Sequence, residues 1–281
     1  MADERASDGF GTGPLSHELW LDKSLALSCG LWADATDLET AQLNKYRLMA
    51  RWAGVTADSR VLDVGSGFGG MLRHLSEEHG VAAACGLDLS GEACQAAREP
   101  GLRGVTVRQG DYRAFTPAEP YDAVVSIGFL ENLAGAEESD RQPELCREFF
   151  ERTHTWTRPG ARLGIETTIL GHSRDWGQEG ARYAEAMRRL RLTGALLRLD
   201  QFLRTCDPWW EPVHVTTHRD DYARTFSEWA DRLRACRQTA ESTGHGQEIA
   251  NYLDFTTNGV ALFDRGTLSV AHLGLRRVDR P

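Results

Sequence analysis

The sequence predicts an α/β protein with a doubly wound, mostly parallel, seven-stranded sheet, an antiparallel C-terminal strand and a helical lid insertion. Short apolar runs alternate with helical patterns at the spacing of strand–helix–strand units. The first run leads into a glycine-rich turn, and residues 268–275 are typical of a terminal antiparallel strand. With 281 residues, the chain can form one large domain or a domain with an inserted cap.

The stretch that organises the rest of the chain is a short strand followed by glycines. Residues 61–64 (VLDV) are typical of a strand buried on both faces, as in a parallel sheet. Residues 65–70 (GSGFGG) follow, and a helix is predicted over residues 71–78. Glycines here let the backbone approach a ligand closely, while helix N–H groups point outward. The turn is therefore predicted to bind a nucleotide-type ligand.

The other elements follow from the alternation of the pattern. A helix opens at Asp37 and runs through Trp52, and a long helix spans residues 220–236. Two later stretches, residues 251–263 and 266–278, are expected to return to the sheet. Further strands are predicted at residues 81–88, 105–111, 121–128 and 161–168, with helices at residues 91–98 and 144–155.

The chain divides into four predicted segments. An N-terminal helical segment that covers the ligand is expected over residues 1–55, of which the first 15 or so are expected to be disordered. The sheet core follows over residues 56–170, a helical lid or substrate insertion over 171–219, and the C-terminal part of the core over 220–281. The lid segment is rich in aromatic residues, which either pack its helices or line a substrate pocket. The second interpretation predicts substrate contacts at Trp176, Tyr183 and Phe202.

Composition excludes several classes of function. The net charge of -9 disfavours a nucleic-acid partner, and no apolar run reaches membrane-spanning length. The six cysteines lack metal-type spacing, and so do the histidines, so no metal site is predicted. The first residues contain no apolar signal-peptide region, which predicts a cytoplasmic protein with free thiols. A small-molecule substrate is expected, and a homo-oligomer is left open.

The glycine turn satisfies G-x-G-x-x-G, so a nicotinamide or flavin dinucleotide must be considered. Three features favour S-adenosylmethionine. Asp63 precedes the glycines by two residues, where it could approach an ammonium group, and Asp111 follows a strand where it could bind an adenine amino group. The antiparallel end of the sheet is the third. Asp88, 23 residues after Gly65, suits hydrogen bonds to ribose hydroxyls.

Several motifs carry a resemblance to a known family. Residues 61–70, with 86–90 (GLDLS) and 110–113 (GDYR), resemble class I S-adenosylmethionine-dependent methyltransferases, which have a Rossmann-like sheet. More narrowly, the chain is similar to the cyclopropane-fatty-acid synthase-like family. That narrower similarity rests on residues 27–29, 37–45, 111–113, 125–131 and 221–229.

The resemblance implies a cofactor site and a catalytic pocket. In the family this pocket holds bicarbonate, which removes a proton after methyl transfer to an alkene. The pocket would map onto Cys29, Ile127, Glu131 and Tyr222. The residues expected around the cofactor are Ser28, Asp63, Gly65, Ser66, Gly67, Asp88, Leu89, Asp111, Tyr112 and Ser126.

Three departures from the family pattern change the expected chemistry. The family's Glu-His pair is Glu131-Asn132, a Gln is replaced by Ala93, and the pocket His is replaced by Glu166. Two carboxylates near one site would repel an added anion, so no bicarbonate is expected. Glu131 or Glu166 is then itself the base or the group that stabilises a cation. Glu166 lies in an apolar run, and burial is expected to raise its pKa.

These residues also have simpler interpretations: Glu131 as an exposed loop carboxylate, and Tyr222 as a packing residue. The hypothesis is that Glu131, Glu166 and Tyr222 are catalytic. The predicted function is methylation of a small molecule in secondary metabolism, at an alkene or another carbon nucleophile. Two alternatives stay open: an N- or O-methyltransferase, and a cyclase or binding protein that keeps the fold without transferring methyl groups.

Overall fold

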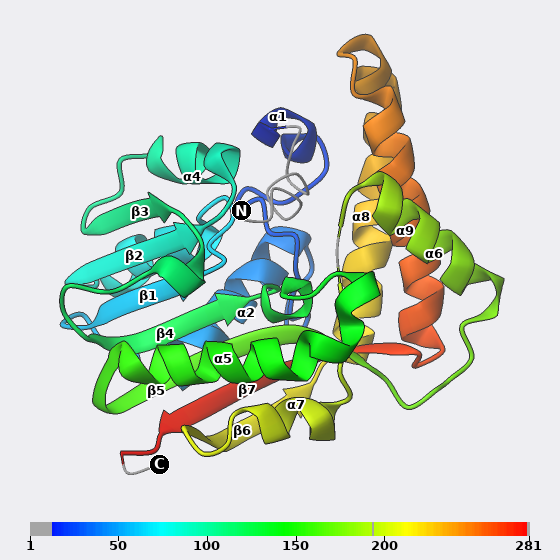
Figure 1. The fold of residues 1–281 in the computed structure, drawn as a ribbon. Helices are drawn as coiled ribbons and strands as arrows, with labels where there is room; N and C mark the ends of the chain where they lie inside the picture. Colours follow the sequence, from blue (N-terminus) through cyan, green and yellow to red (C-terminus); the bar gives the residue numbers. More distant parts are fainter. Residues whose placement is uncertain (1–12, 193, 280–281) are drawn as a thin grey trace.

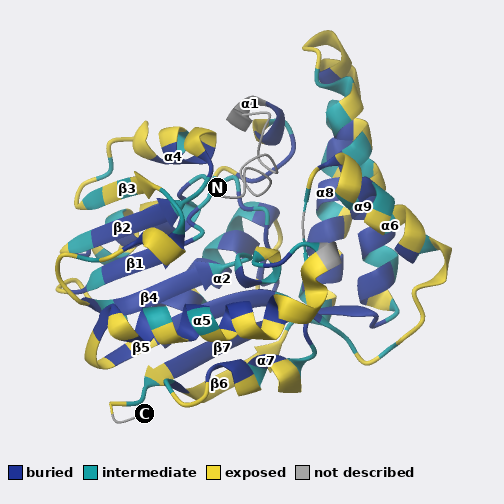
Figure 2. Cartoon of the chain, in the orientation of Figure 1, coloured by how far each residue is buried: buried dark blue, intermediate teal, exposed yellow. Residues whose placement is uncertain are grey.

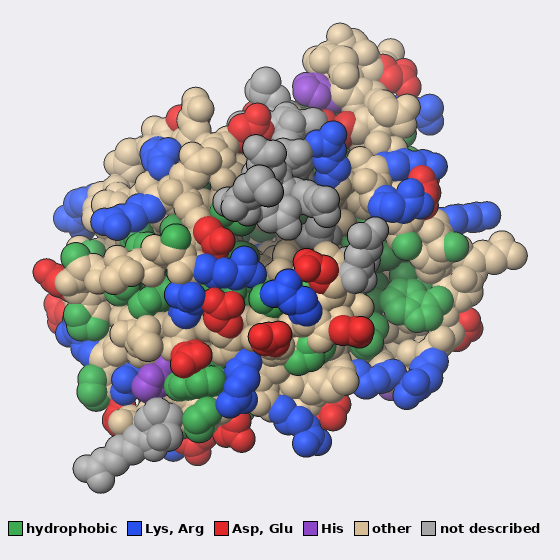
Figure 3. All heavy atoms as spheres, in the orientation of Figure 1, with side chains coloured by type: hydrophobic (Ala, Val, Ile, Leu, Met, Phe, Trp, Pro, Cys, Tyr) green, Lys and Arg blue, Asp and Glu red, His purple; other side chains and the backbone are tan. Residues whose placement is uncertain are grey.

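The computed structural model describes residues 13–192 and 194–279, which form a sheet covered by helices and flanked by a helical layer (Figure 1). Most of the segment expected to be disordered, residues 1–12, lies outside these ranges, and helix α1 (Gly13–Glu18) begins where they start. Acidic and basic side chains are interspersed on the face shown in Figure 3.

The sheet has the order β3-β2-β1-β4-β5-β7-β6. Strands β1 to β5 are parallel, and β7 runs antiparallel between β5 and β6. The predicted fold class is confirmed, and the carboxyl ends of the parallel strands meet at one edge. The strands are β1 (Arg60–Val64), β2 (Ala83–Asp88), β3 (Val105–Gln109), β4 (Tyr121–Ile127), β5 (Thr157–Leu170), β6 (Trp210–Thr217) and β7 (Leu268–Arg277).

Helices cover both faces of the sheet (Figure 1). Successive residues of β1 point to opposite faces, so Val61 lies in a buried cluster with Met49 and Met71, whereas Leu62 lies in one with Phe149. Figure 2 shows how completely the central strands are buried between these layers. The helices involved are α2 (Leu38–Trp52), α3 (Gly70–His74), α4 (Gly91–Arg98), α5 (Gln142–Thr155) and α7 (Leu199–Thr205).

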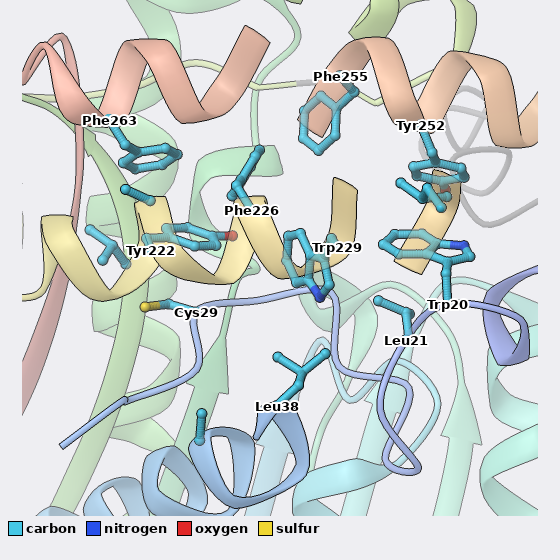
Figure 4. Packing of buried hydrophobic residues seen from close by; sticks show 14 of the residues in the cluster. Trp20, Leu21, Cys29, Leu38, Tyr222, Phe226, Trp229, Tyr252, Phe255 and Phe263 are labelled. Atoms are coloured by element: carbon cyan, nitrogen blue, oxygen red, sulfur yellow. The ribbon is translucent and has the colours of Figure 1, made fainter. Parts of the chain in front are cut away.

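A third layer of helices stands beside the carboxyl edge of the sheet and consists of α6 (Gly177–Arg189), α8 (Arg219–Ser242) and α9 (Gly246–Asp264). Its core is aromatic. Figure 4 shows Tyr222, Phe226 and Trp229 of α8 between Phe263 of α9 and the N-terminal segment that carries Cys29. The N-terminal segment is therefore enclosed between the helical layer and the sheet.

Two elements correct the predictions. Residues 210–217, expected in the helical lid, form the edge strand β6; beyond Trp210 all its residues are exposed, so no buried alternation marks it in the sequence. Residues 251–263, expected to return to the sheet, belong to α9, whose buried residues recur every three or four positions. An apolar stretch can be a buried helix or a strand, and here the helical spacing decides.

Candidate active site

The glycine turn after β1 requires glycine at each left-handed position. Gly65, Gly67 and Gly69 have φ values of 76°, 51° and 84°. A Cβ on Gly65 would lie 2.6 Å from the ring of Phe129, whereas a Cβ on Gly67 would meet no atom within 4 Å. The turn is thus packed on one side and open at Gly67.

Two acids flank this open side. Asp88 Oδ2 accepts a hydrogen bond from Gly67 N–H at 2.8 Å, and its Oδ1 accepts one from Ser90 N–H at 2.9 Å. Burial nevertheless raises the pKa of Asp88. Asp63 is buried, and burial together with the charge of Asp88 raises its pKa to about 7, against the opposing charge of Lys45. A cation bound here would stabilise both carboxylates.

Other residues predicted around the cofactor lie near the same edge of the sheet. The hydroxyls of Ser66 and Tyr112 are buried without a hydrogen-bond partner among the described residues. Asp111 caps the turn that begins at Tyr112 by accepting from Arg113 N–H at 2.8 Å. Ser126 Oγ instead donates to the Val64 carbonyl at 2.9 Å, so that hydroxyl is used within the sheet.

The N-terminal segment is anchored to the site by a buried lysine. Lys45 Nζ, on α2, donates to Ser28 Oγ, and Gln42 Nε2 donates to the Ser28 carbonyl at 2.9 Å. Lys45 is fully buried, and burial lowers its pKa, although the charges of Glu166 and three other groups raise it. No role for this cation was predicted from the sequence, although Lys45 lies in one of the family-like motifs.

Glu166 lies in β5 and is 1% exposed. Its Oε1 accepts a hydrogen bond from Cys29 N–H at 2.9 Å, and its Oε2 lies 3.1 Å from Nε2 of His272 on β7. Burial raises the pKa of Glu166, but the hydrogen bond and charge of His272, with the charge of Lys45, leave it below the ordinary value. The prediction of a raised pKa was wrong, because the partners across the sheet were not foreseen.

Glu131 is not an exposed loop carboxylate. It follows β4 in a short 3₁₀ turn, and its oxygens accept from Thr168 N–H at 3.1 Å and from the Thr167 hydroxyl at 3.0 Å. Burial raises the pKa of Glu131, and the charge of Glu166 adds to that effect. The two predicted carboxylates therefore have pKa values displaced in opposite directions.

Tyr222 stands between these carboxylates and the aromatic layer. Its ring packs against Phe263, with centroids 4.7 Å apart, and burial raises its pKa well above the ordinary value. The charges of Glu166, Cys29 and Glu131 contribute to that shift. The hydroxyl therefore lies in the electrostatic field of both carboxylates, and the packing interpretation accounts for the ring alone.

The remaining predicted pocket residues separate into two groups. Cys29 is fully buried with a raised pKa, chiefly because of burial, and Ile127 is the register partner of Glu166. Tyr183 of α6 stacks on Phe255 with centroids 4.9 Å apart, and the charge of Glu131 adds to the rise in its pKa that burial causes. These three therefore lie in the surroundings of Glu131 and Glu166.

Trp176 and Phe202 do not. Trp176 is 41% exposed before the first turn of α6, and Phe202 packs on Phe150 of α5 in the core, with centroids 5.8 Å apart. Neither is retained as a substrate contact. Aromatic residues in a predicted lid cannot be divided into pocket and packing residues without the direction of each helix.

A cavity of about 1170 Å³ opens beside the site, at the carboxyl ends of β5 and β6. His218 and Asp221 line it, and the ring of His218 contacts that of His272, with centroids 4.9 Å apart. All six cysteines are free, as predicted. Within residues 13–192 and 194–279, there is neither a cluster of metal-ligating side chains nor a helix long and apolar enough to cross a bilayer.

This sheet order, with a glycine turn after β1 and an antiparallel β7, defines the Rossmann-like fold of class I methyltransferases. The fold is similar to that of the mycolic acid cyclopropane synthase CmaA1 in its complex with S-adenosylhomocysteine and CTAB. The TM-score is 0.85 at 21% sequence identity, over 97% of both chains. The chain belongs to the mycolic acid cyclopropane synthetase family, whose sequence model matches residues 10–273.

Curated relatives agree with this assignment. The chain is 33% identical over 115 residues to the cyclopropane-fatty-acyl-phospholipid synthase of Escherichia coli K12, which is 40% of this chain and 29% of that enzyme. The match therefore spans less than a third of the relative's length. The S-adenosylmethionine-dependent methyltransferase UmaA of Mycobacterium tuberculosis is 25% identical over 277 residues, covering 92% of both chains.

Proposed function

We propose that this protein is an S-adenosylmethionine-dependent methyltransferase that methylates carbon, at an alkene or another carbon nucleophile of an apolar small molecule. The observation that carries the proposal is the pair of hydrogen-bonded carboxylates at the carboxyl end of β4, Glu131 and Glu166, whose pKa values are displaced in opposite directions. The names of the relatives, which refer to fatty acids and mycolic acids, support an apolar alkene. A role in secondary metabolism remains a prediction.

The residues at the glycine turn fit this cofactor. Gly67 leaves open space, the Ser66 hydroxyl lacks a partner among the described residues, and Asp63 and Asp88 have pKa values that a nearby cation would lower. When bound, S-adenosylmethionine supplies an electrophilic methyl group and positive charge. Asp88 and Asp111 would hold its nucleoside end, and Asp63 would face its ammonium end.

Comparing the two glycines tests the cofactor site. Gly67→Ala should weaken S-adenosylmethionine binding by at least about tenfold, because the added methyl enters space that only a ligand fills. Gly65→Ala should instead lower the free energy of unfolding by about 1–3 kcal/mol more than Gly67→Ala, because its Cβ overlaps Phe129. Both positions have left-handed φ, so backbone strain is matched. Calorimetric titration and thermal unfolding measure the two effects; unchanged cofactor affinity in Gly67→Ala would contradict this site.

The two carboxylates have distinct tasks in the reaction. When bound, S-adenosylmethionine would supply the methyl group to the alkene electron pair, with S-adenosylhomocysteine as the leaving group, and the substrate would be left with a positive charge on carbon. Glu166 is held ionised and stabilises that charge. Glu131, whose raised pKa makes it the stronger base, removes a proton from an adjacent carbon, and the electrons of that carbon–hydrogen bond complete the product. Aromatic faces of the helical layer add cation–π stabilisation and exclude water.

Labelled S-adenosylmethionine, incubated with a panel of apolar alkenes, tests the activity. S-adenosylhomocysteine should form together with a product in which mass spectrometry and NMR place the label on carbon. A label on nitrogen or oxygen would identify the alternative methyltransferase. Isomerisation of a substrate without S-adenosylhomocysteine would identify the non-methylating cyclase instead.

Methyl transfer should not require bicarbonate. Both carboxylates already occupy the pocket, and together they would repel an added anion. Rates measured in degassed, carbonate-free buffer should therefore match those after bicarbonate is added, at constant ionic strength. A saturable dependence on bicarbonate would show that an anion, rather than a glutamate, accepts the proton.

A further inference from the structure

Glu166 and His272 form an enclosed pair across two antiparallel strands. They are register partners in β5 and β7, they are 1% and 0% exposed, and His272 Nε2 lies 3.1 Å from Glu166 Oε2. The other oxygen accepts from Cys29 N–H at 2.9 Å. Each oxygen of the carboxylate therefore has its own donor within the protein, and its orientation is fixed from two sides.

Glu131 provides an internal comparison for the effect of this pairing. Glu166 is buried and Glu131 is half-buried, and both accept hydrogen bonds from the protein. Burial prevails at Glu131 and raises its pKa, whereas at Glu166 the hydrogen bond and charge of His272 and the charge of Lys45 overcome burial. The histidine and the lysine are thus what distinguishes the two sites. His272 alone of these two touches the carboxylate.

His272 is itself held in place by a second histidine. The ring of His218 meets it edge to face, at 4.9 Å between centroids and an angle of 84°. His218 is fixed in turn, because its Nδ1 lies 2.8 Å from Asp221 Oδ2 and its Nε2 lies 3.0 Å from Thr216 Oγ1. The His272 Nδ1 atom has no hydrogen-bond partner among the described residues, so Glu166 is the polar partner that orients the ring.

We propose that His272 is a positioning residue that keeps Glu166 ionised and in one orientation during turnover. A carboxylate, rather than a neutral carboxyl group, then faces the developing cation. The effect on rate rests on the proposed function, whereas the effect on the ionisation of Glu166 does not. The other titratable groups around the pair are Lys45 and Tyr46 on α2, the Cys29 thiol on the N-terminal segment, Glu131 after β4, and His218, Asp221 and Tyr222 at the start of α8.

Two substitutions at this position test the proposal. In His272→Leu the donor is lost, so the pKa of Glu166 should rise, and the part of the acidic limb that Glu166 controls, below the break set by Glu131, should move upward by about one unit or more. On that limb the rate then falls at least about tenfold, since one unit is tenfold in the ionised fraction. His272→Gln can still offer an amide N–H to Glu166 and should show a smaller shift. His214→Leu, a histidine of β6 that stacks on Trp52, is the matched control and should leave the limb unmoved.

The pH profile separates positioning from a structural role. If His272→Leu lowered the rate by one factor at every pH, His272 would only support the fold and the proposal would be overturned. In a Glu166→Gln background, His272→Leu should cause no further shift, because the group that it controls is gone. A further shift in that background would contradict the proposal equally.

A measurement that needs no turnover distinguishes the proposed role of His272 from the proposed methyltransferase function. The ionisation of Glu166 is followed by carboxylate infrared or ¹³C NMR titration of the wild type and of both His272 variants. A raised pKa in the variants supports the role of His272 even if no acceptor is ever methylated, in which case only the proposed function fails. An unchanged pKa overturns the role of His272. If His272→Leu does not fold, His272→Gln is used for the same titration.

Discussion

Replacing Glu131 with Gln should lower the rate of product formation by about 10²–10⁴-fold, the usual contribution of a positioned general base. Gln keeps the size of the side chain and can still accept from Thr168 N–H, so the fold and cofactor affinity should persist. The loss should appear in single-turnover measurements with saturating S-adenosylmethionine. Glu211→Gln, at an exposed position of β6, is the matched control.

The stability of the Glu131 variant follows from the direction of the pKa shift. A carboxyl group whose pKa is raised on folding contributes stability at low pH, which is lost as the pH rises through its folded-state pKa. Glu131→Gln removes that dependence, so it should be at least as stable as the wild type at pH 8. If Glu131→Gln kept its activity within a few-fold of the wild type, Glu166 rather than Glu131 would be the base.

Replacing Lys45 with Met should lower the free energy of unfolding by about 3–5 kcal/mol at pH 8, the usual cost of removing one partner from buried charges. Lys45 is fully buried, and its charge lowers the pKa of both Glu166 and Asp63. Without it, two buried carboxylates lose their counter-charge, and Ser28 loses a donor. Chemical denaturation measures the change, with Lys23→Met, at an exposed position, as the control.

The Lys45 variant should recover part of this loss in acid. Asp63 has its pKa raised to about 7, so its unfavourable charge disappears as the pH falls from about 8 to about 5. The difference between the variant and the wild type should therefore narrow over that range. A difference that is the same at pH 5 and pH 8 would mean that Lys45 acts through packing rather than through charge.

The parallel part of the fold could be predicted because its signals are local. β1 and its glycine turn have a pattern that few other structures share, and Asp37 caps α2 through Thr40 N–H at 2.8 Å, as a helix start requires. β6 could not be predicted in this way, because all its residues beyond Trp210 are exposed and no alternation of buried and exposed positions marks it. Residues 251–263 were predicted to return to the sheet because an apolar stretch is compatible with a strand and with a helix. Only the spacing of the buried residues indicates α9.

The candidate site could be predicted only in part. Glu131, Glu166 and Tyr222 were identified from their motifs, and their surroundings in the structure support their proposed roles. His272 was missed because its role depends on the register of β7 against β5, which no local pattern specifies. The signal that could have found it is a histidine in the middle of an otherwise apolar strand. The direction of the pKa shift at Glu166 was predicted wrongly for the same reason, because His272 was not recognised as its partner.

The antiparallel strand β7 has a consequence for how this protein can change during evolution. It lies between β5 and β6 and places His272 opposite Glu166, so a shift of one residue in its register would turn His272 to the other face of the sheet. An insertion or deletion within β7 would therefore separate His272 from Glu166. The helical layer of α6, α8 and α9 provides the aromatic surface, and its residues take no part in the pairing of β7 with β5. We expect the specificity for the methyl acceptor to change through substitutions in those helices, while Glu166 and His272 are retained.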